Sequence, residues 1–215
     1  KPHNMRTYIL SIALSIISIT TLYPNKPADA ESIMNKLIHT LTTNGIQTNF
    51  SLTVIEKNKV ISQAIRGNFK MKAEKFNLEM PELKVWFDGK TQWSYSASDN
   101  EVTITEPMQT DLQALNPLAF MAAFKAKSIV RFSKQTSTEQ HFIELIPRSK
   151  KEAFSSILIG INKSSNFPQM LHVRDQKQQV HQFKLTGFKL VHTLTDRTFV
   201  FNKSDFNSVV VNDLR

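Results

Sequence analysis

The chain has 215 residues, of which 27 are basic and 18 acidic, and its formal net charge at neutral pH is +9. It contains no cysteine, which excludes thiol chemistry, disulfide staples and lipidation at an N-terminal cysteine. The basic residues are spread along the chain, so they favour anionic partners such as lipid headgroups or acidic proteins, or form an ordinary solvated surface. No helix-turn-helix or base-stacking motif accompanies them, and nucleic-acid binding is not expected.

Residues 1–30 have the features of a secretory signal peptide. Residues 1–4 precede the first methionine and are expected to be an upstream artefact, and Arg6 supplies the positive charge. The apolar run from Tyr8 to Leu22 is shorter than the roughly 20 residues that span a bilayer. Ala28-Asp29-Ala30 places small residues where a signal peptidase reads them, so we expect cleavage after Ala30. The alternative is a permanent N-terminal anchor.

We expect residues 31–215 to form one domain, because no linker, repeat or low-complexity run interrupts them. Cleavage would remove three basic residues and one acidic residue, leaving a net charge of +7. A chain of this length buries a substantial core without covalent staples.

A helix is predicted over residues 31–44. Its apolar residues fall on one face at helical spacing, and Asn44-Gly45 is a typical stop. The apolar residues of that face are Ile33, Met34, Leu37, Ile38 and Leu41.

After this helix the apolar period changes to two, which is typical of strands with one buried face. Phe50, Leu52 and Val54 begin the alternation, and residues 57–59 read as a turn. Asp88-Gly89 is a typical hairpin turn farther along. The strands predicted in this meander are 60–72, 76–80, 83–87 and the segments around 93–95 and 102–104.

Residues 108–126 return to helical spacing, and Asn116-Pro117 splits them into two short helices. Strands are predicted again near 129–134, 139–146, 155–162, 169–174 and 179–188, with a last strand or edge at 199–201 and 208–211. We therefore expect an α+β, mainly β fold. Its core is a large curved antiparallel sheet, an incomplete barrel, with helices covering the concave face. The apolar face under those helices is a natural place for a hydrophobic ligand.

Motifs of catalysis are missing from the sequence. It has no Gly-x-Ser-x-Gly, no His-Glu-x-x-His and no phosphate-binding glycine loop. Asp88, Asp99 and Glu101 surround a hairpin, where turn chemistry explains them better than catalysis does. We expect no enzyme, no metal and no cofactor. The alternative, a secreted hydrolase, requires His172, His181 and a carboxylate to converge.

The apolar composition offers two interpretations. Phenylalanine occurs 15 times and methionine seven times, against three tyrosines and two tryptophans. Bulky, flexible side chains suit a cavity for irregular acyl chains, but they also fill the core of any β domain.

Residues 67–107 resemble the periplasmic outer-membrane lipoprotein carrier family, the LolA-like proteins. In that family a strand starting with glycine precedes an aromatic strand, an Asp-Gly-Lys-Thr-x-Trp-x-Tyr hairpin and a Val-Thr strand. The matching residues here are Asp88-Gly89-Lys90-Thr91, Trp93, Tyr95 and Glu101 to Ile104, with Asn116-Pro117-Leu118 at the mid-chain helices and an ending, Val209 to Arg215, of the same type.

The resemblance implies an open sheet of the LolA and LppX type, whose cavity is lidded by helices. It also implies a monomeric periplasmic carrier that shields the acyl chains of lipoproteins between the inner and outer membranes. Its partners would be an inner-membrane release complex and an outer-membrane acceptor. Better-studied members hold the lid with an Arg-Pro pair, where this chain has Lys72-Ala73-Glu74. The alternative is a periplasmic module on the same fold that senses lipid or envelope stress.

Alternation along the strands and the mid-chain helices selects the residues expected to line the lipid-binding cavity. A slip of one residue would reverse the face of a strand. The expected lining residues are Phe50, Leu52, Phe69, Met71, Phe76, Leu78, Met80, Trp93, Tyr95, Leu118, Met121 and Phe124.

Overall fold

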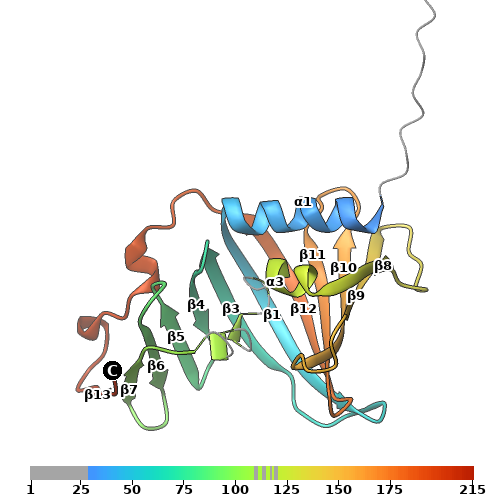
Figure 1. Cartoon of the computed structure of the whole chain (residues 1–215). Coiled ribbons are helices and arrows are strands. Elements are labelled where there is room, and N and C mark those ends of the chain that lie inside the picture. The colour runs from blue at the N-terminus through green and yellow to red at the C-terminus, as the bar shows by residue number, and fades with distance from the viewer. Residues whose placement is uncertain (1–28, 109–110, 113–114, 117, 119–120) are drawn as a thin grey trace, which may run out of the picture.

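The computed structural model describes residues 29–108, 111–112, 115–116, 118 and 121–215. Within these residues one sheet of thirteen strands curves around a long N-terminal helix (Figure 1). The helices are α1 (Ala30–Thr43) and α3 (Met121–Ala126), with the 3-10 turns η1 (Asp196–Phe199) and η2 (Lys203–Asp205). The strands are β1 (Gly45–Glu56), β2 (Lys59–Val60), β3 (Ile65–Lys72), β4 (Lys75–Glu79), β5 (Leu83–Phe87), β6 (Gln92–Ser96), β7 (Glu101–Thr105), β8 (Ser128–Phe132), β9 (Gln140–Pro147), β10 (Phe154–Asn162), β11 (Pro168–Asp175), β12 (Val180–Leu190) and β13 (Val210–Asp213).

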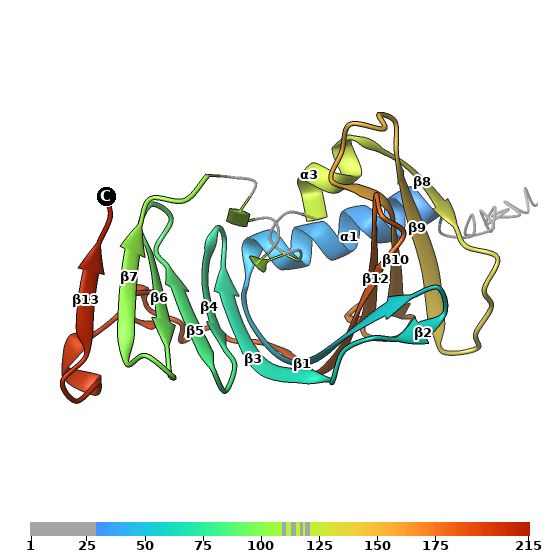
Figure 2. The same cartoon turned by 90° about the horizontal axis from the view of Figure 1, so that it is seen from below.

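Strand β1 joins two meanders into one sheet. The spatial order is β13-β7-β6-β5-β4-β3-β1-β12-β11-β10-β9-β8, with β2 paired to β1. The pairs are antiparallel except β13, which runs parallel to β7. Figure 2 shows the sheet bending around α1 as an incomplete ring. The predicted fold class, a curved antiparallel sheet with helices on its concave face, is confirmed.

Helix α1 forms where the sequence predicts it. The backbone N–H of Ser32 donates a 2.7 Å hydrogen bond to Oδ1 of Asp29, which satisfies one of the free donors of the first turn. Met34, Leu37 and Leu41 are buried along one stripe, the pattern of a helix packed on a core. The predicted signal peptide lies outside the described residues as far as residue 28.

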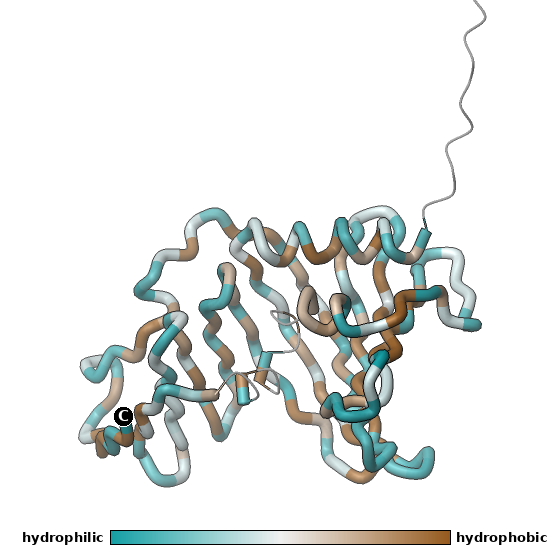
Figure 3. Tube along the Cα trace, in the orientation of Figure 1, coloured by the Kyte–Doolittle hydropathy of each residue, from teal (hydrophilic) through white to brown (hydrophobic). Residues whose placement is uncertain are grey.

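The inner face of the sheet is the face that packs against α1 and α3. Along the strands apolar and polar residues alternate, as Figure 3 shows. Helix α3 is held over β8–β10 by the ring of Phe124, whose centroid lies 4.9 Å from that of Phe154. Nζ of Lys125 lies 2.6 Å from Oε2 of Glu31, so an ion pair also joins α3 to α1.

The C-terminal segment covers the outer face of β5–β7. The ring of Phe206 lies 4.5 Å from that of Tyr95 and 6.0 Å from that of Trp86, while Phe201 lies 5.6 Å from Trp86. Val102 of β7 is fully buried beneath this cover. The sheet therefore has a second, smaller apolar layer on its outer side.

Three predicted elements differ from the structure. The strand predicted at 60–72 is divided, because residues 61–64 leave the ladder between β2 and β3. Phe199 ends the 3-10 turn η1 and residues 200–201 are in no strand, so the strand predicted at 199–201 is wrong. Of the helices predicted over 108–126, α3 is present, and part of the remainder lies outside the described residues.

Candidate apolar binding site

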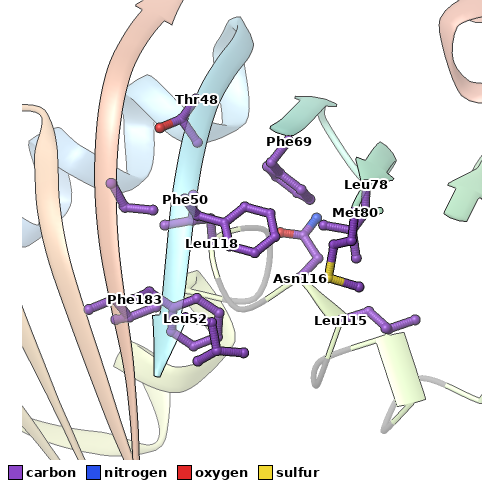
Figure 4. A pocket seen from close by; sticks show the side chains of 12 residues that line it. Thr48, Phe50, Leu52, Phe69, Leu78, Met80, Leu115, Asn116, Leu118 and Phe183 are labelled. Carbon is purple, nitrogen blue, oxygen red and sulfur yellow. The ribbon is translucent and has the colours of Figure 1, made fainter. Parts of the chain in front are cut away.

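A cavity of about 150 Å³ lies on the inner face of the sheet, between its strands and the side chains of Leu115, Asn116 and Leu118 (Figure 4). Ten of its lining side chains are apolar, and no charged side chain is among them. The lining residues are Thr48, Phe50, Leu52, Phe69, Leu78, Met80, Leu115, Asn116, Leu118, Leu171, Phe183 and Leu185.

The pairing of β1 with β12 builds one wall of the cavity. Phe50 lies opposite Leu185 and Leu52 lies opposite Phe183, so all four side chains share the inner face. The rings of Phe50 and Phe183 are 6.4 Å apart between centroids. These two rings are therefore in loose contact.

Gly67 makes room for the ring of Phe50. The two residues are opposite one another in the β1–β3 pair, and a Cβ on Gly67 would lie 2.6 Å from Cζ of Phe50 and 2.5 Å from the backbone oxygen of Glu79. A side chain at this position would push the phenylalanine ring or the strand aside.

Strands β3 and β4 build the opposite wall. In Figure 4, Phe69, Leu78 and Met80 lie across the cavity from Leu52 and Phe183. Phe69 and Leu78 are cross-strand partners, and the Phe69 ring stacks 6.0 Å from that of Phe76 behind it.

Two polar residues, Thr48 and Asn116, complete the lining. The hydroxyl of Thr48 donates to the backbone oxygen of Thr186 at 3.2 Å, so its polar atom is satisfied within the sheet. Among the described residues that line the cavity no side chain is ionisable, so these walls suit an apolar group.

Six of the residues predicted from the sequence line the cavity. They are Phe50, Leu52, Phe69, Leu78, Met80 and Leu118. Four others are buried in the core without lining it, namely Met71, Phe76, Met121 and Phe124. Whether any of them contacts a lipid stays a prediction.

Trp93 and Tyr95 lie on the wrong face of the sheet for the predicted role. Trp93 pairs with Trp86 and Tyr95 with Lys84, whereas the inner-face residue Val85 pairs with Ser94. The inner face of β6 is therefore polar, and its aromatic side chains belong to the outer face that the C-terminal segment covers. The prediction that Trp93 and Tyr95 line the cavity is therefore wrong, because the residues of β6 one position away from them occupy the inner face.

Six lining residues were not predicted: Thr48, Leu115, Asn116, Leu171, Phe183 and Leu185. Phe183 and Leu185 alternate with polar neighbours within a predicted strand, so their shared face was readable from the sequence. Their position beside Phe50 was not, because it depends on the pairing of β1 with β12.

The lid arrangement differs from that implied by an Arg-Pro pair. Nζ of Lys72 donates to the backbone oxygen of Leu194 at 3.1 Å, so this cation binds the C-terminal segment. Ala73 occupies the turn that follows, with a φ of 54°. The described contacts that hold α3 include the Lys125–Glu31 pair and the Phe124–Phe154 contact.

A second hollow, of about 430 Å³, lies on the outer face of β9–β12. Its lining includes Glu144, His172, Arg174 and Gln182, and its walls are as polar as they are apolar. Burial and the nearby Arg174 lower the pKa of His172 below its ordinary value of 6.5. Gln182 is the cross-strand partner of His172, so the next residue, His181, lies on the opposite face, 3.8 Å from Asp175. The two histidines therefore do not share a pocket.

Among the described residues, no three histidine, cysteine or carboxylate side chains are grouped so that they could hold a metal ion. Nor does any helix in the described part of the chain have the length and apolar character needed to cross a membrane.

An open, curved antiparallel sheet with an apolar cavity under a helical segment defines a class of half-barrel binding folds. Residues 21–177 match the family described as Outer membrane lipoprotein carrier protein LolA, and the chain belongs to this family.

Comparison with solved structures finds similar chains at low sequence identity, the first with a TM-score above 0.5. An uncharacterized conserved protein from Thermus thermophilus is 15% identical with a TM-score of 0.55, over 84% of this chain and 96% of that one. A LolA superfamily protein from Nitrosomonas europaea is 14% identical with a TM-score of 0.45, over 81% and 98%. The MucA/MucB complex of Pseudomonas aeruginosa is 14% identical with a TM-score of 0.44, over 85% of this chain and 64% of that one. No curated protein matches the sequence significantly.

Proposed function

We propose that this protein is a monomeric periplasmic carrier that shields acyl chains of lipoproteins during transfer from the inner to the outer membrane. The observation that carries the proposal is the uncharged cavity on the inner face of the sheet, walled by Phe50, Phe69 and Phe183. Membership of the lipoprotein carrier family supports the choice of cargo.

The energy of exposing an acyl chain explains why a carrier is needed. Each CH₂ group transferred from an apolar environment to water costs about 0.8 kcal/mol, so a chain of a dozen such groups costs roughly 10 kcal/mol. A lipoprotein with several acyl chains therefore cannot cross the aqueous space at a useful rate without a protein that covers them.

The size of the cavity sets a condition on binding. At about 150 Å³ it is smaller than the roughly 300 Å³ at the lower end of pockets that enclose drug-sized ligands. An acyl chain must therefore widen it, and the unbranched, flexible side chain of Met80 is suited to move aside.

Widening has a functional consequence. The free energy spent on separating the cavity walls is subtracted from the affinity for the acyl chain. Binding then stays reversible, which a handover requires: an inner-membrane release complex would load the cavity and an outer-membrane acceptor would empty it.

Filling the cavity tests the proposal. We expect Leu118→Trp to abolish binding of a fluorescent fatty acid while the protein stays folded, since the indole occupies the space between the walls. The matched control is Leu190→Trp, which adds the same side chain at a partly exposed position at the end of β12. Binding by the Leu118→Trp variant at wild-type affinity would contradict the cavity as the site.

Cargo and transfer are tested on the protein purified from the periplasm. Mass spectrometry is expected to find lipid or triacylated protein after incubation with inner membranes, and delivery to outer membranes is expected to follow. Bound lipid that is never delivered would instead support the sensing module.

A further inference from the structure

The hairpin formed by β1 and β2 carries an exposed apolar cluster. Val60 is 65% exposed, Ile61 51% and Ile65 44%, all within a stretch of six residues. Exposed aliphatic side chains gathered in one short segment are a feature of surfaces that bind other molecules.

The backbone holds this cluster in a defined conformation. Lys57 and Asn58 form a two-residue turn with φ values of 47° and 64°, the conformation of a tight hairpin. Beyond it, the N–H of Ile61 donates to the oxygen of Val54 at 2.9 Å, and the N–H of Val54 donates to Oγ of Ser62 at 2.9 Å. The apolar side chains are therefore presented by an ordered ribbon.

Ile61 and Ile65 continue the wall of the cavity. Ile65 is the cross-strand partner of Leu52, which lines the cavity, so both side chains are on the inner face. Ile61 lies opposite Val54, which is on the same face two residues farther along β1. An apolar track thus runs from the cavity along the inner face of β1 to Ile61, while Val60, the cross-strand partner of Ile55, extends from the outer face of the same ribbon.

Basic residues surround this end of the sheet. The hairpin itself carries Lys57, Lys59 and Arg66, all exposed. The end of β1 lies beside the start of β12, which lies beside the end of β11, which lies beside the start of β10. The connections at this same edge therefore add Lys177 from the turn 176–179, and Arg148, Lys150 and Lys151 from the connection 148–153.

The acidic groups at this edge offset only part of that charge. Oε2 of Glu152 pairs with Lys127 at 3.3 Å, and Asp175 accepts a hydrogen bond from the N–H of Gln179. Glu56, at the end of β1, is the third acidic residue among these connections. In Figure 1 the hairpin stands at the end of the sheet farthest from α1, so the helix does not cover it.

We propose that this hairpin, residues 57–66, docks the protein on an anionic lipid bilayer. Val60, Ile61 and Ile65 would enter the interface between headgroups and acyl chains, while Lys57, Lys59 and Arg66 would contact anionic headgroups. An acidic protein surface would neutralise the lysines but leave the aliphatic side chains in water, so a bilayer matches both features.

This inference rests on the proposed carrier function and extends it. A bilayer seated against the hairpin lies at the outer end of the apolar track, so an acyl chain could enter the cavity without crossing water. The docking itself needs no cargo and is measured separately.

Vesicle sedimentation tests the docking. Wild-type protein is expected to bind vesicles of phosphatidylglycerol and phosphatidylcholine, and to bind pure phosphatidylcholine far more weakly. Raising the salt concentration should release it, since the Debye length shortens from about 10 Å at 0.1 M to about 3 Å at 1 M. The charge variant K57Q/K59Q should lower the partition coefficient about tenfold or more, and V60S/I61S should lower it as well.

Matched variants control for total charge and hydrophobicity. K189Q/K203Q removes two exposed lysines away from the hairpin, one near the end of β12 and one in η2, and V210S/V211S removes two exposed valines from β13. Both are expected to bind vesicles nearly as wild type does. Equal losses in the control and hairpin variants, or no binding by wild type, would overturn the proposal.

A label reports whether the hairpin enters the bilayer. Because the chain has no cysteine, Ile61→Cys can carry a single environment-sensitive dye, with Val210→Cys as the control. A blue shift with anionic vesicles is expected only for the Ile61 variant. Binding of polyglutamate but not of vesicles would overturn the proposal in favour of an acidic partner. The fatty-acid assay on the same variants shows whether the cavity still binds, which separates failure of docking from failure of the carrier function.

Discussion

The sheet has two aromatic-rich regions, one covered by other side chains and one beside a cavity. On the outer face of β5–β7, Trp86 and Tyr95 are covered by Phe201 and Phe206 of the C-terminal segment, with ring centroids as close as 4.5 Å. On the inner face, Phe50 and Phe183 stand 6.4 Å apart beside a cavity of about 150 Å³.

The difference lies in the source of the covering group. The outer region is covered by a segment of the chain itself, which is covalently attached. The inner region is left incompletely filled by the described residues around it. Similar side chains thus form a closed layer in one place and line a cavity in the other.

The largest expected effect contrasts the packed core with the cavity wall. Phe76 is fully buried, with its ring 5.5 Å from that of Phe87, so Phe76→Ala should cost about 3–5 kcal/mol of unfolding free energy. Phe183→Ala should cost less than half as much, because its ring already borders empty space. Urea denaturation measures both, and equal costs would mean that the cavity wall is packed like the core.

Gly67→Ala should affect the cavity from behind its wall. The new Cβ collides with the Phe50 ring and the Glu79 carbonyl, so we expect a loss of about 1–3 kcal/mol of stability and weaker fatty-acid binding. Adding Phe50→Leu should recover part of the stability, since it removes one of the two collisions. No recovery would place the strain at the backbone of β4 instead.

Phe206→Ala should open the covered outer region without touching the inner one. We expect a loss of about 1–2 kcal/mol and a red shift of tryptophan fluorescence as Trp86 becomes hydrated, with fatty-acid affinity unchanged. Phe132→Ala, at a residue 46% exposed on the edge strand β8, is the control. Weaker fatty-acid binding by the Phe206 variant would show that the two regions are coupled.

The smallest effect concerns the uncovered outer face of β9–β12. Burial lowers the pKa of His172 in the folded protein, so the unfolded chain takes up the proton more readily and stability falls as the pH drops through about 6.5. His172→Gln should make this slope shallower in denaturation midpoints measured from pH 7.5 to 5. Part of the slope should remain, because burial and Lys163 lower the pKa of His141 in the same way. An unchanged slope would contradict the assignment.

Local signals in the sequence were enough for the elements that form locally. The stripe of Ile33 to Leu41 and the stop at Asn44 predict α1 to within one residue at each end. The Asp88-Gly89 turn is closed by hydrogen bonds from the N–H groups of Lys90 and Thr91 to Oδ1 of Asp88. The residues of the turn themselves therefore specify its conformation.

The pairing of the strands and the inner face of each could not be predicted from such local signals. Alternation shows which residues of a strand share a face but not which face is inner, and β6 has aromatic residues on the outer one. The contact of Thr48 with Thr186 joins residues 138 positions apart, and no local pattern predicts it. The break after Val60 was hidden because Ile61 and Ile65 suit a strand, while Oγ of Ser62 takes the place of a ladder bond.

The two ends of the strand order, β13 and β8, are not paired with each other. In a closed barrel the number of strands and their stagger determine the radius, so the interior cannot grow unless hydrogen bonds break. In an open sheet each strand can rotate slightly about its neighbour while the ladder stays intact. The width of the space on the inner face can therefore change with the curvature of the whole sheet.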